Sequence, residues 1–206
     1  MLTKIDTDAS GTLSETERNA VTSIDLGGTS STPHQCENLQ GIEYFQRLSI
    51  LKCGIGSLKK LDVSQNTALT WIECPLTQIE ELDASGLQSL TLIECRGNRN
   101  LKKLIVNDCP RLNNLSCWAA GLTSLDVTGC PALSYLSCAD NQLTSLDVTQ
   151  NTSLTTLYCY MNEISEIDLS QNTSLSTFSG NQQKLGILSM YYDAESGKYV
   201  NSKKSE

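Results

Sequence analysis

The sequence contains little of the material that enzymes and membrane proteins use. It has one histidine, His34, and only 5% of its residues are aromatic. The sequence therefore has too few histidines for a metal centre built on histidine, and almost none that could activate a nucleophile. No run approaches the roughly 20 consecutive apolar residues of a membrane-spanning helix, so we expect no membrane insertion. With two phenylalanines in 206 residues, leucine and isoleucine must supply the core.

Positive charge is also scarce, because 15 basic residues face 23 acidic ones and the net charge is −8. Such a chain repels nucleic acid and anionic lipid at long range, so neither is expected as a partner. The sequence contains no P-loop, no dinucleotide-binding glycine motif and no serine-containing elbow. We therefore predict that this protein is not an enzyme.

Nine cysteines would ordinarily indicate a disulfide scaffold, but their spacing indicates a repeat. Six of them follow one another at intervals of 21, 21, 22, 21 and 21 residues. Aligned on these cysteines, the chain between Leu48 and Met190 falls into seven units of the pattern L-x-x-L-x-C-x-x-N-x-L-x-x-L-D-V, of which residues 133–148 are a full copy. In the seventh unit, Phe178 replaces the second leucine and Gly180 replaces the cysteine. The six cysteines are Cys53, Cys74, Cys95, Cys117, Cys138 and Cys159.

Both halves of this unit place apolar residues with a period of two, which predicts two short extended segments per unit. A unit this small cannot bury its own apolar face, so neighbours must stack about 4.8 Å apart into a parallel-sheet solenoid. We expect the cysteine column to face inward, where cysteine acts as a small apolar residue. A disulfide between Cys109 and Cys130, one repeat apart at a turn, is the alternative.

Charged residues recur on the second segment of the unit. Lys59-Lys60, Glu80-Glu81 and Lys102-Lys103 place opposite charges on adjacent coils, which favours stacking. Aspartates recur beside the second leucine of this segment, and we expect them to accept bonds from turn amides rather than to bind calcium. They are Asp62, Asp83, Asp126, Asp147 and Asp168.

The repeat closely resembles the short bacterial form of the leucine-rich repeat over residues 48–190. The likeness is to internalin-like proteins that gut bacteria secrete or display. It implies a leucine-rich repeat solenoid of about seven coils of 21–22 residues, with a parallel β-sheet on the concave face. It also implies an extracellular or bacterial cell-surface location and a binding role. Gly56, Thr77, Ala120 and Gln183 stand where the family usually has asparagine, which predicts an incomplete asparagine ladder.

Segments at both ends of the array can cover its core. Residues 21–47 predict an N-terminal cap and a leading coil, in which Val21, Ile24, Asp25 and Leu26 copy the second segment of the unit. Residues 39–45 carry apolar residues three apart, which predicts a short helical turn. Residues 191–206 predict a hairpin cap followed by a polar tail.

Residues 6–17 match the ligand pattern of a calcium-binding loop. Positions 1, 3, 5, 7, 9 and 12 are Asp6, Asp8, Ser10, Thr12, Ser14 and Glu17, and Gly11 occupies the turn position. The loop resembles that of an EF-hand or dockerin, which implies calcium as a cofactor at one site. Only Met1 to Ile5 precede it and no second loop is present, so an empty acidic turn before a short helix is the alternative. Either way, residues 1–20 form a separate N-terminal segment.

Aromatic residues gather on the outward side of the predicted sheet. The outward positions of the L-x-x-L-x-C segment and of the residues just after it hold both tryptophans and three of the seven tyrosines. Such a concentration in an aromatic-poor protein favours a binding site, while packing between coils is the alternative. The predicted partner-binding residues are Trp71, Trp118, Tyr135, Tyr158, Tyr160 and Met161, bordered by Asn114, Ser116, Ser137 and Asp140.

We therefore expect a monomer that recognises a macromolecule, with a protein as the favoured partner. A glycan-binding module that uses the same aromatic residues is one alternative. A structural spacer within a larger surface protein is the other.

Overall fold

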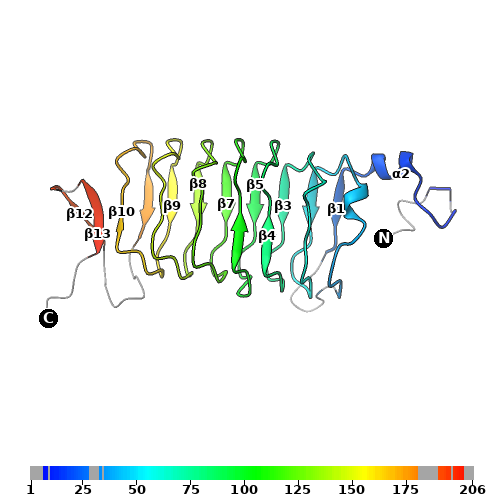
Figure 1. The fold of residues 1–206 in the computed structure, drawn as a ribbon, viewed down its shortest axis with the longest axis horizontal. Coiled ribbons are helices and arrows are strands. Elements are labelled where there is room, and N and C mark those ends of the chain that lie inside the picture. Colours follow the sequence, from blue (N-terminus) through cyan, green and yellow to red (C-terminus); the bar gives the residue numbers. More distant parts are fainter. Residues whose placement is uncertain are drawn as a thin grey trace.

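The computed structural model describes residues 7–8, 10–27, 33, 35–180, 190–195 and 197–201. They form a β-solenoid of about six turns, elongated along the direction in which the coils stack (Figure 1). The exact count of seven coils stays a prediction, because residues 181–189 of the last repeat lie outside the described residues.

One parallel sheet runs the length of the solenoid, in the order β1-β2-β3-β5-β7-β8-β9-β11. Its strands pair in register with the equivalent residues of the next coil, as Leu51 does with Ile72. The backbone hydrogen bonds therefore join coils rather than closing within one, so each coil depends on its neighbours. The strands are β1 (Ser23–Asp25), β2 (Ile50–Lys52), β3 (Trp71–Glu73), β5 (Leu92–Glu94), β7 (Asn114–Ser116), β8 (Tyr135–Ser137), β9 (Thr156–Tyr158) and β11 (Thr177–Ser179).

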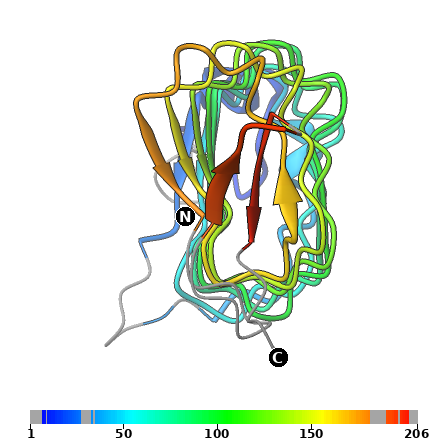
Figure 2. The ribbon, with the colours of Figure 1, turned by 90° about the vertical axis from the view of Figure 1, so that its left-hand side faces the viewer.

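The opposite side of the coils has fewer regular strands. β4 (Glu81–Asp83) pairs in parallel with β6 (Lys103–Ile105). β10 (Glu166–Ile167) pairs antiparallel with β13 (Lys198–Asn201), which forms a hairpin with β12 (Met190–Asp193). Viewed along the solenoid axis, the coils superpose and this hairpin is nearest the viewer (Figure 2). Tyr199 of β13 packs on Phe178 of β11, with ring centroids 5.1 Å apart.

The core lies between the two sides of each coil and consists of columns of leucine, isoleucine, valine and cysteine. Cys53, Cys74, Cys95, Cys117, Cys138 and Cys159 each have 0% exposure, which confirms the inward column. Burial raises the pKa of these thiols, to about 12 for Cys53 and Cys159. Because only the thiolate is a good nucleophile or metal ligand, these cysteines act as packing residues.

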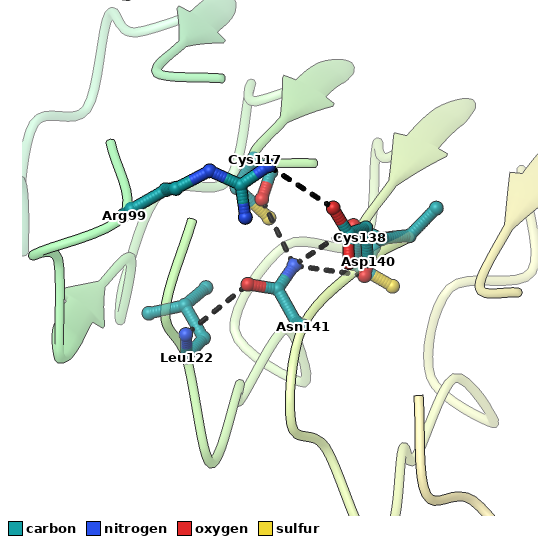
Figure 3. Close-up of polar contacts among 7 residues, drawn as sticks. Arg99, Cys117, Leu122, Cys138, Asp140 and Asn141 are labelled. Atoms are coloured by element: carbon teal, nitrogen blue, oxygen red, sulfur yellow. Dashed lines mark hydrogen bonds and ion pairs between the residues drawn. The ribbon is translucent and has the colours of Figure 1, made fainter. Parts of the chain in front are cut away.

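Asparagine side chains hold the turn that follows each of three sheet strands. Nδ2 of Asn141 donates to the carbonyl oxygens of Cys117 and Cys138, at 3.0 and 2.9 Å (Figure 3). Its Oδ1 accepts from the backbone N–H of Leu122 at 3.1 Å. Asn98 and Asn162 likewise join two successive coils. The ladder is incomplete, as predicted, because residues 77 and 120 are threonine and alanine.

The other turn uses asparagine and cysteine for the same purpose. Nδ2 of Asn151 donates to the carbonyl of Val127 at 2.9 Å. Cys130 in the preceding coil donates its thiol to the carbonyl of Val106 at 3.3 Å, and Cys109 to that of Ala84 at 3.1 Å. The alternative of a Cys109–Cys130 disulfide is therefore wrong, since no disulfide joins any of the nine cysteines.

The N-terminal strand lies on a different side from the predicted one. The pattern places residues 21–26 on the second segment of a coil, whereas β1 belongs to the long sheet and pairs Ile24 with Leu51. The prediction is wrong because both segments of the unit share the L-x-x-L spacing, and only the neighbouring coil selects between them. The predicted helical turn is present as the 3-10 helix η1 (Ile42–Tyr44), and helix α2 (Glu15–Ala20) precedes β1.

The predicted contacts of the second segment are present in part. All five aspartates accept from the backbone N–H two residues on, as Asp62 does from Ser64 at 3.0 Å. Lys103 pairs with Glu81 at 2.9 Å and Lys102 with Glu80 at 3.7 Å. Lys59 pairs instead with Glu37 of the leading coil. These exposed pairs favour the register of the coils more than their stability, because each contributes only about 0–1 kcal/mol.

Candidate functional site

Five of the six predicted binding residues lie on three adjacent coils, on the side of the long sheet that faces away from the core. Tyr135 begins β8 and Tyr158 ends β9. Their rings meet edge to face, with centroids 6.0 Å apart and planes at 69°. Trp118 lies just after the end of β7, and Tyr160 and Met161 lie just after the end of β9. We call Trp118, Tyr135, Tyr158, Tyr160 and Met161 the outer-face cluster.

The cluster combines exposed and partly buried side chains. Trp118 is 43% exposed and Met161 is 38% exposed, whereas the three tyrosines are partly buried. The tyrosines therefore pack against their neighbours while keeping part of each ring accessible. Ring packing between Tyr135 and Tyr158 therefore holds the cluster in place, while Trp118 and Met161 leave apolar surface uncovered.

Small side chains lie among the aromatic ones. Ser116, Ser137 and Ala139 retain only 6%, 5% and 1% of their exposure, although all three occupy outward positions of the sheet. The predicted polar border is therefore wrong for the two serines, while Asn114 and Asp140 are partly exposed at its edge.

Trp71 lies apart from the cluster, because β5 separates its strand β3 from β7. The ammonium group of Lys52 lies 4.4 Å from the centroid of the Trp71 ring and pairs with Glu73 at 3.3 Å. On the next coil Glu94 pairs with Arg96 at 3.1 Å. The outward side of the sheet thus carries ion pairs at β2, β3 and β5, whereas the outer-face cluster contains no charged residue.

A positively charged arm borders the cluster at its turn side. We number the coils from the one that begins at Leu48. The guanidinium of Arg99 reaches across coil four to Asp140 on coil five, at 3.6 Å (Figure 3). The residues beneath it are small, and a Cβ on Gly121 would lie 2.6 Å from the carbonyl oxygen of Arg99. The extra residue of coil three, which gives the cysteine interval of 22, supplies this arm.

Leu76, which was not among the predicted binding residues, has an exposed apolar side chain, at 48%. It lies two residues after Cys74, in the same turn position that Met161 occupies after Cys159. Extending the outward columns by one residue past Trp118 and Tyr160 would have found it.

The calcium-type loop is described in part, because Asp6 lies outside the described residues. Gly11 has φ +80°, the left-handed conformation that its turn position requires. Ser14 caps helix α2, and Glu17 completes a capping box. Both Glu17 oxygens accept hydrogen bonds, from Thr7 Oγ1 at 2.7 Å and from the Ser14 backbone at 3.0 Å among others. These bonds lower the pKa of Glu17 to about 2, with the Thr7 hydroxyl as the largest cause.

A stack of short parallel strands over buried leucine and cysteine columns defines a leucine-rich-repeat-like β-solenoid. No protein-family model matches the chain, and the comparison with curated proteins finds no match. Among the described residues, no helix is both long enough and apolar enough to cross a membrane.

Solved structures of bacterial proteins do match. The functional domain of InlJ from Listeria monocytogenes, which includes a cysteine ladder, is 29% identical over 84% of this chain, with a TM-score of 0.64. This chain spans 42% of the length of that structure. Internalin C2 from Listeria monocytogenes is 19% identical over 88% of this chain and 83% of its own length, with a TM-score of 0.69. A leucine-rich repeat protein from Leptospira interrogans is 18% identical over 82% of this chain and 52% of its own, with a TM-score of 0.51.

Proposed function

We propose that this chain is a non-catalytic binding module that recognises a protein through the outer-face cluster. The observation that carries the proposal is the uncharged group of exposed Trp118 and Met161 beside three tyrosines, in a chain with 5% aromatic residues. Covering such side chains releases apolar surface from water, and tryptophan and tyrosine dominate the energetics of protein interfaces.

The cluster is prepared for binding because its members lose little conformational freedom. Tyr135 and Tyr158 sit on strands that are hydrogen-bonded to coils on both sides, and their rings already contact each other. Tyrosine and tryptophan have two side-chain torsions each, so a partner need not order many rotamers. A rigid, uncharged aromatic surface supports recognition by shape rather than by long-range attraction.

We place this module outside the cell, as a secreted or surface-attached bacterial protein that acts as a monomer. The likeness to internalin-type repeats supports this setting. The calcium-type loop is consistent with it, because a loop of this kind suits the millimolar calcium of extracellular modules.

We further propose that the N-terminal loop binds one calcium ion. The left-handed Gly11 and the carboxylate of Glu17 at the start of α2 fit the loop pattern. The residues that would hold the ion are Asp6, Asp8, Ser10, Thr12, Ser14 and Glu17. When bound, calcium would tie the loop to the helix and so stiffen the N-terminal segment.

Calcium titration followed by calorimetry tests this loop. We expect millimolar calcium to raise the melting temperature of the N-terminal segment, and E17Q to abolish the rise because a bidentate carboxylate is lost. The matched control is E15Q, which removes an exposed carboxylate of the same helix turn. An unchanged melting temperature in calcium would refute the site.

A glycan-binding module is the second candidate. The exposed indole of Trp118, next to uncharged residues such as Asn114, suits stacking on a sugar ring. A glycan array and a panel of purified bacterial and host surface proteins, both probed with the intact chain, separate the two candidates. A third possibility, a structural spacer, predicts no specific binding in either format.

The decisive variants are W118A and Y158A, with Y44A as the matched control. Tyr44 is 61% exposed and lies in η1, away from the cluster. Aromatic anchors at interface centres contribute about 2 kcal/mol or more, so both cluster variants should weaken binding about thirtyfold. Retained affinity in both variants, or binding to glycans alone, would overturn protein recognition by this face.

A further inference from the structure

A cavity of about 590 Å³ lies at the N-terminal end of the solenoid, between α2 and the leading coil. Its volume falls within the range of small-molecule sites, about 300–1,000 Å³. Its walls are mainly apolar, and Arg18 is the one charged residue among the described residues that line it. The apolar walls consist of Leu13, Ile24, Leu26, Leu39, Ile42 and Phe45. We call this space the N-terminal cavity.

The cavity exists because α2 adds no apolar face to the leading coil. Leu26 and Leu39 pack on the buried core at one side, and the other side of each faces the cavity. A solenoid normally covers such an end with a capping element. Helix α2 lies at this end (Figure 1), but its sequence is E-T-E-R-N-A and its one buried residue is Glu17. The helix therefore supplies the charged side chain of Arg18 to the cavity and leaves the apolar walls uncovered.

Hydrogen bonds to coil one fix the walls of the cavity. Nδ2 of Asn66 donates to the carbonyl oxygens of Ile42 and Phe45, at 2.9 and 3.2 Å, and so holds η1 and the residue after it in place. The backbone N–H of Leu26 donates to the carbonyl of Lys52 at 3.0 Å. Walls held in this way are formed before a ligand arrives, so binding requires little ordering of the backbone.

The positive charge at the cavity wall has no carboxylate partner. The guanidinium of Arg18 lies 5.9 Å from the centroid of the Tyr44 ring and donates to the carbonyl of Leu13. No carboxylate of the described residues forms an ion pair with it. The carboxylate of the adjacent Glu17 accepts hydrogen bonds within the calcium-type loop instead. Because a guanidinium has five N–H donors, Arg18 keeps donors for an anionic group of a ligand.

We propose that the N-terminal cavity binds a small amphiphile with an apolar chain and a carboxylate head group. The chain lies against the leucine, isoleucine and phenylalanine walls, where its burial removes apolar surface from water. The carboxylate pairs with the guanidinium of Arg18, whose geometry matches both oxygens. A single positive charge in the lining favours a singly charged head group. The site is separate from the outer-face cluster of coils four to six, so it is independent of the proposed protein binding.

Decanoate, titrated into the full chain in calcium-free buffer and followed by calorimetry, tests the proposal. We expect saturable binding of one decanoate per chain, and about tenfold weaker binding of decanol, which has the same chain without the charge. R18Q should weaken decanoate about tenfold and leave decanol unchanged, because only the charged head group pairs with this residue. The matched control is R47Q, which removes an exposed arginine that does not line the cavity.

Cys36 provides a second measurement that does not depend on the charge. Its thiol lines the cavity, and it is the one cysteine of the nine that is not buried. At ten times its dissociation constant, decanoate should slow the reaction of Cys36 with a disulfide-exchange reagent about tenfold, because the ligand covers the thiol in most chains. An N-ethylmaleimide adduct on Cys36 should abolish decanoate binding, because the adduct fills part of the cavity. C36S, which keeps the cavity open, should bind decanoate as the unaltered chain does.

Four results would overturn the proposal: no saturable binding of decanoate, equal affinity for decanoate and decanol, equal losses in R18Q and R47Q, or undiminished binding to the Cys36 adduct. Retained decanol binding by R18Q shows that its cavity is intact, whereas loss of both ligands would mean that Arg18 shapes the cavity and does not recognise the head group. If decanoate does not bind and the full chain sediments as a dimer, a second copy of the chain occupies the cavity instead.

Discussion

The side-chain oxygen of Asn141 accepts a hydrogen bond from the backbone N–H of Leu122, in the preceding coil, at 3.1 Å. The same amide donates to carbonyls on both coils, so Asn141 satisfies groups of both polarities. At the other turn, Asn151 only donates, and its Oδ1 has no hydrogen-bond partner among the described residues. The two asparagine positions therefore have different requirements, although both lie in turns of the repeat.

We expect Asn141 and Asn151 to differ when each is replaced by cysteine. N141C leaves the buried N–H of Leu122 without an acceptor, which costs about 1–3 kcal/mol of unfolding free energy. N151C should cost less, because a thiol donates at the equivalent position in Cys130. Urea denaturation measures both. Equal losses would show that the acceptor role of Asn141 is unimportant.

Thiol reactivity checks the cysteine column. Eight of the nine cysteines are buried, and Cys36 is the exception. Burial raises the pKa of the ladder thiols, well above the usual value for Cys74 and Cys95, so little thiolate is present near neutral pH. A disulfide-exchange reagent at pH 8 should modify one thiol per native chain and nine per denatured chain. C36S should lose the rapid phase, and fewer than nine thiols on denaturation would contradict the absence of disulfides.

The capping box at α2 predicts an acid-sensitive N-terminal segment. The pKa of Glu17 falls from about 4.5 to about 2 on folding, because Thr7 and Ser14 donate to its carboxylate. A lowered folded-state pKa gives stability that is complete above pH 4.5 and is lost as the pH falls toward 2. The protection factor of the Ser14 amide against hydrogen exchange, which corrects for the intrinsic pH dependence of exchange, should fall over this interval. In E17Q, which keeps a capping side chain but cannot titrate, the same exchange should show no such acid step.

The two tryptophans should respond differently to acrylamide. Lys52 covers the Trp71 ring, whose indole nitrogen is buried, while Trp118 is 43% exposed. W71F, which reports Trp118, should therefore be quenched more steeply than W118F, which reports Trp71. Adding K52A to W118F should raise its quenching. Equal quenching in the two single variants would show that Trp71 is as accessible to acrylamide as Trp118.

Much of the fold could be predicted from the repeat, because a regular interval of 21 residues leaves only stacking as a way to bury each apolar face. The inward cysteines and the aspartate-to-turn bonds follow from that register. The position of residues 21–26 could not be predicted, since Ile24 fits either side of a coil and pairs with Leu51 only because β2 lies beside it.

Most of the candidate site was also visible in the outward columns, but its boundaries were not. Spacing places Trp71 and Trp118 in related positions without showing that Lys52 covers one of them. It does not show that Ser116 and Ser137 are buried, or that Leu76 is exposed in a left-handed turn. These properties depend on side chains from adjacent coils.

By itself, the sequence determined the periodicity of this protein, and with it the parallel stacking, the leucine and cysteine core and the outward columns. Each repeat carries the same pattern of apolar residues, so seven copies make the periodicity unambiguous. Only the tertiary structure decided which outward side chains are accessible and which are covered by ion pairs or rings. Accessibility is set largely by contacts between adjacent coils, such as that of Lys52 with Trp71, and such contacts exist only once the coils are stacked.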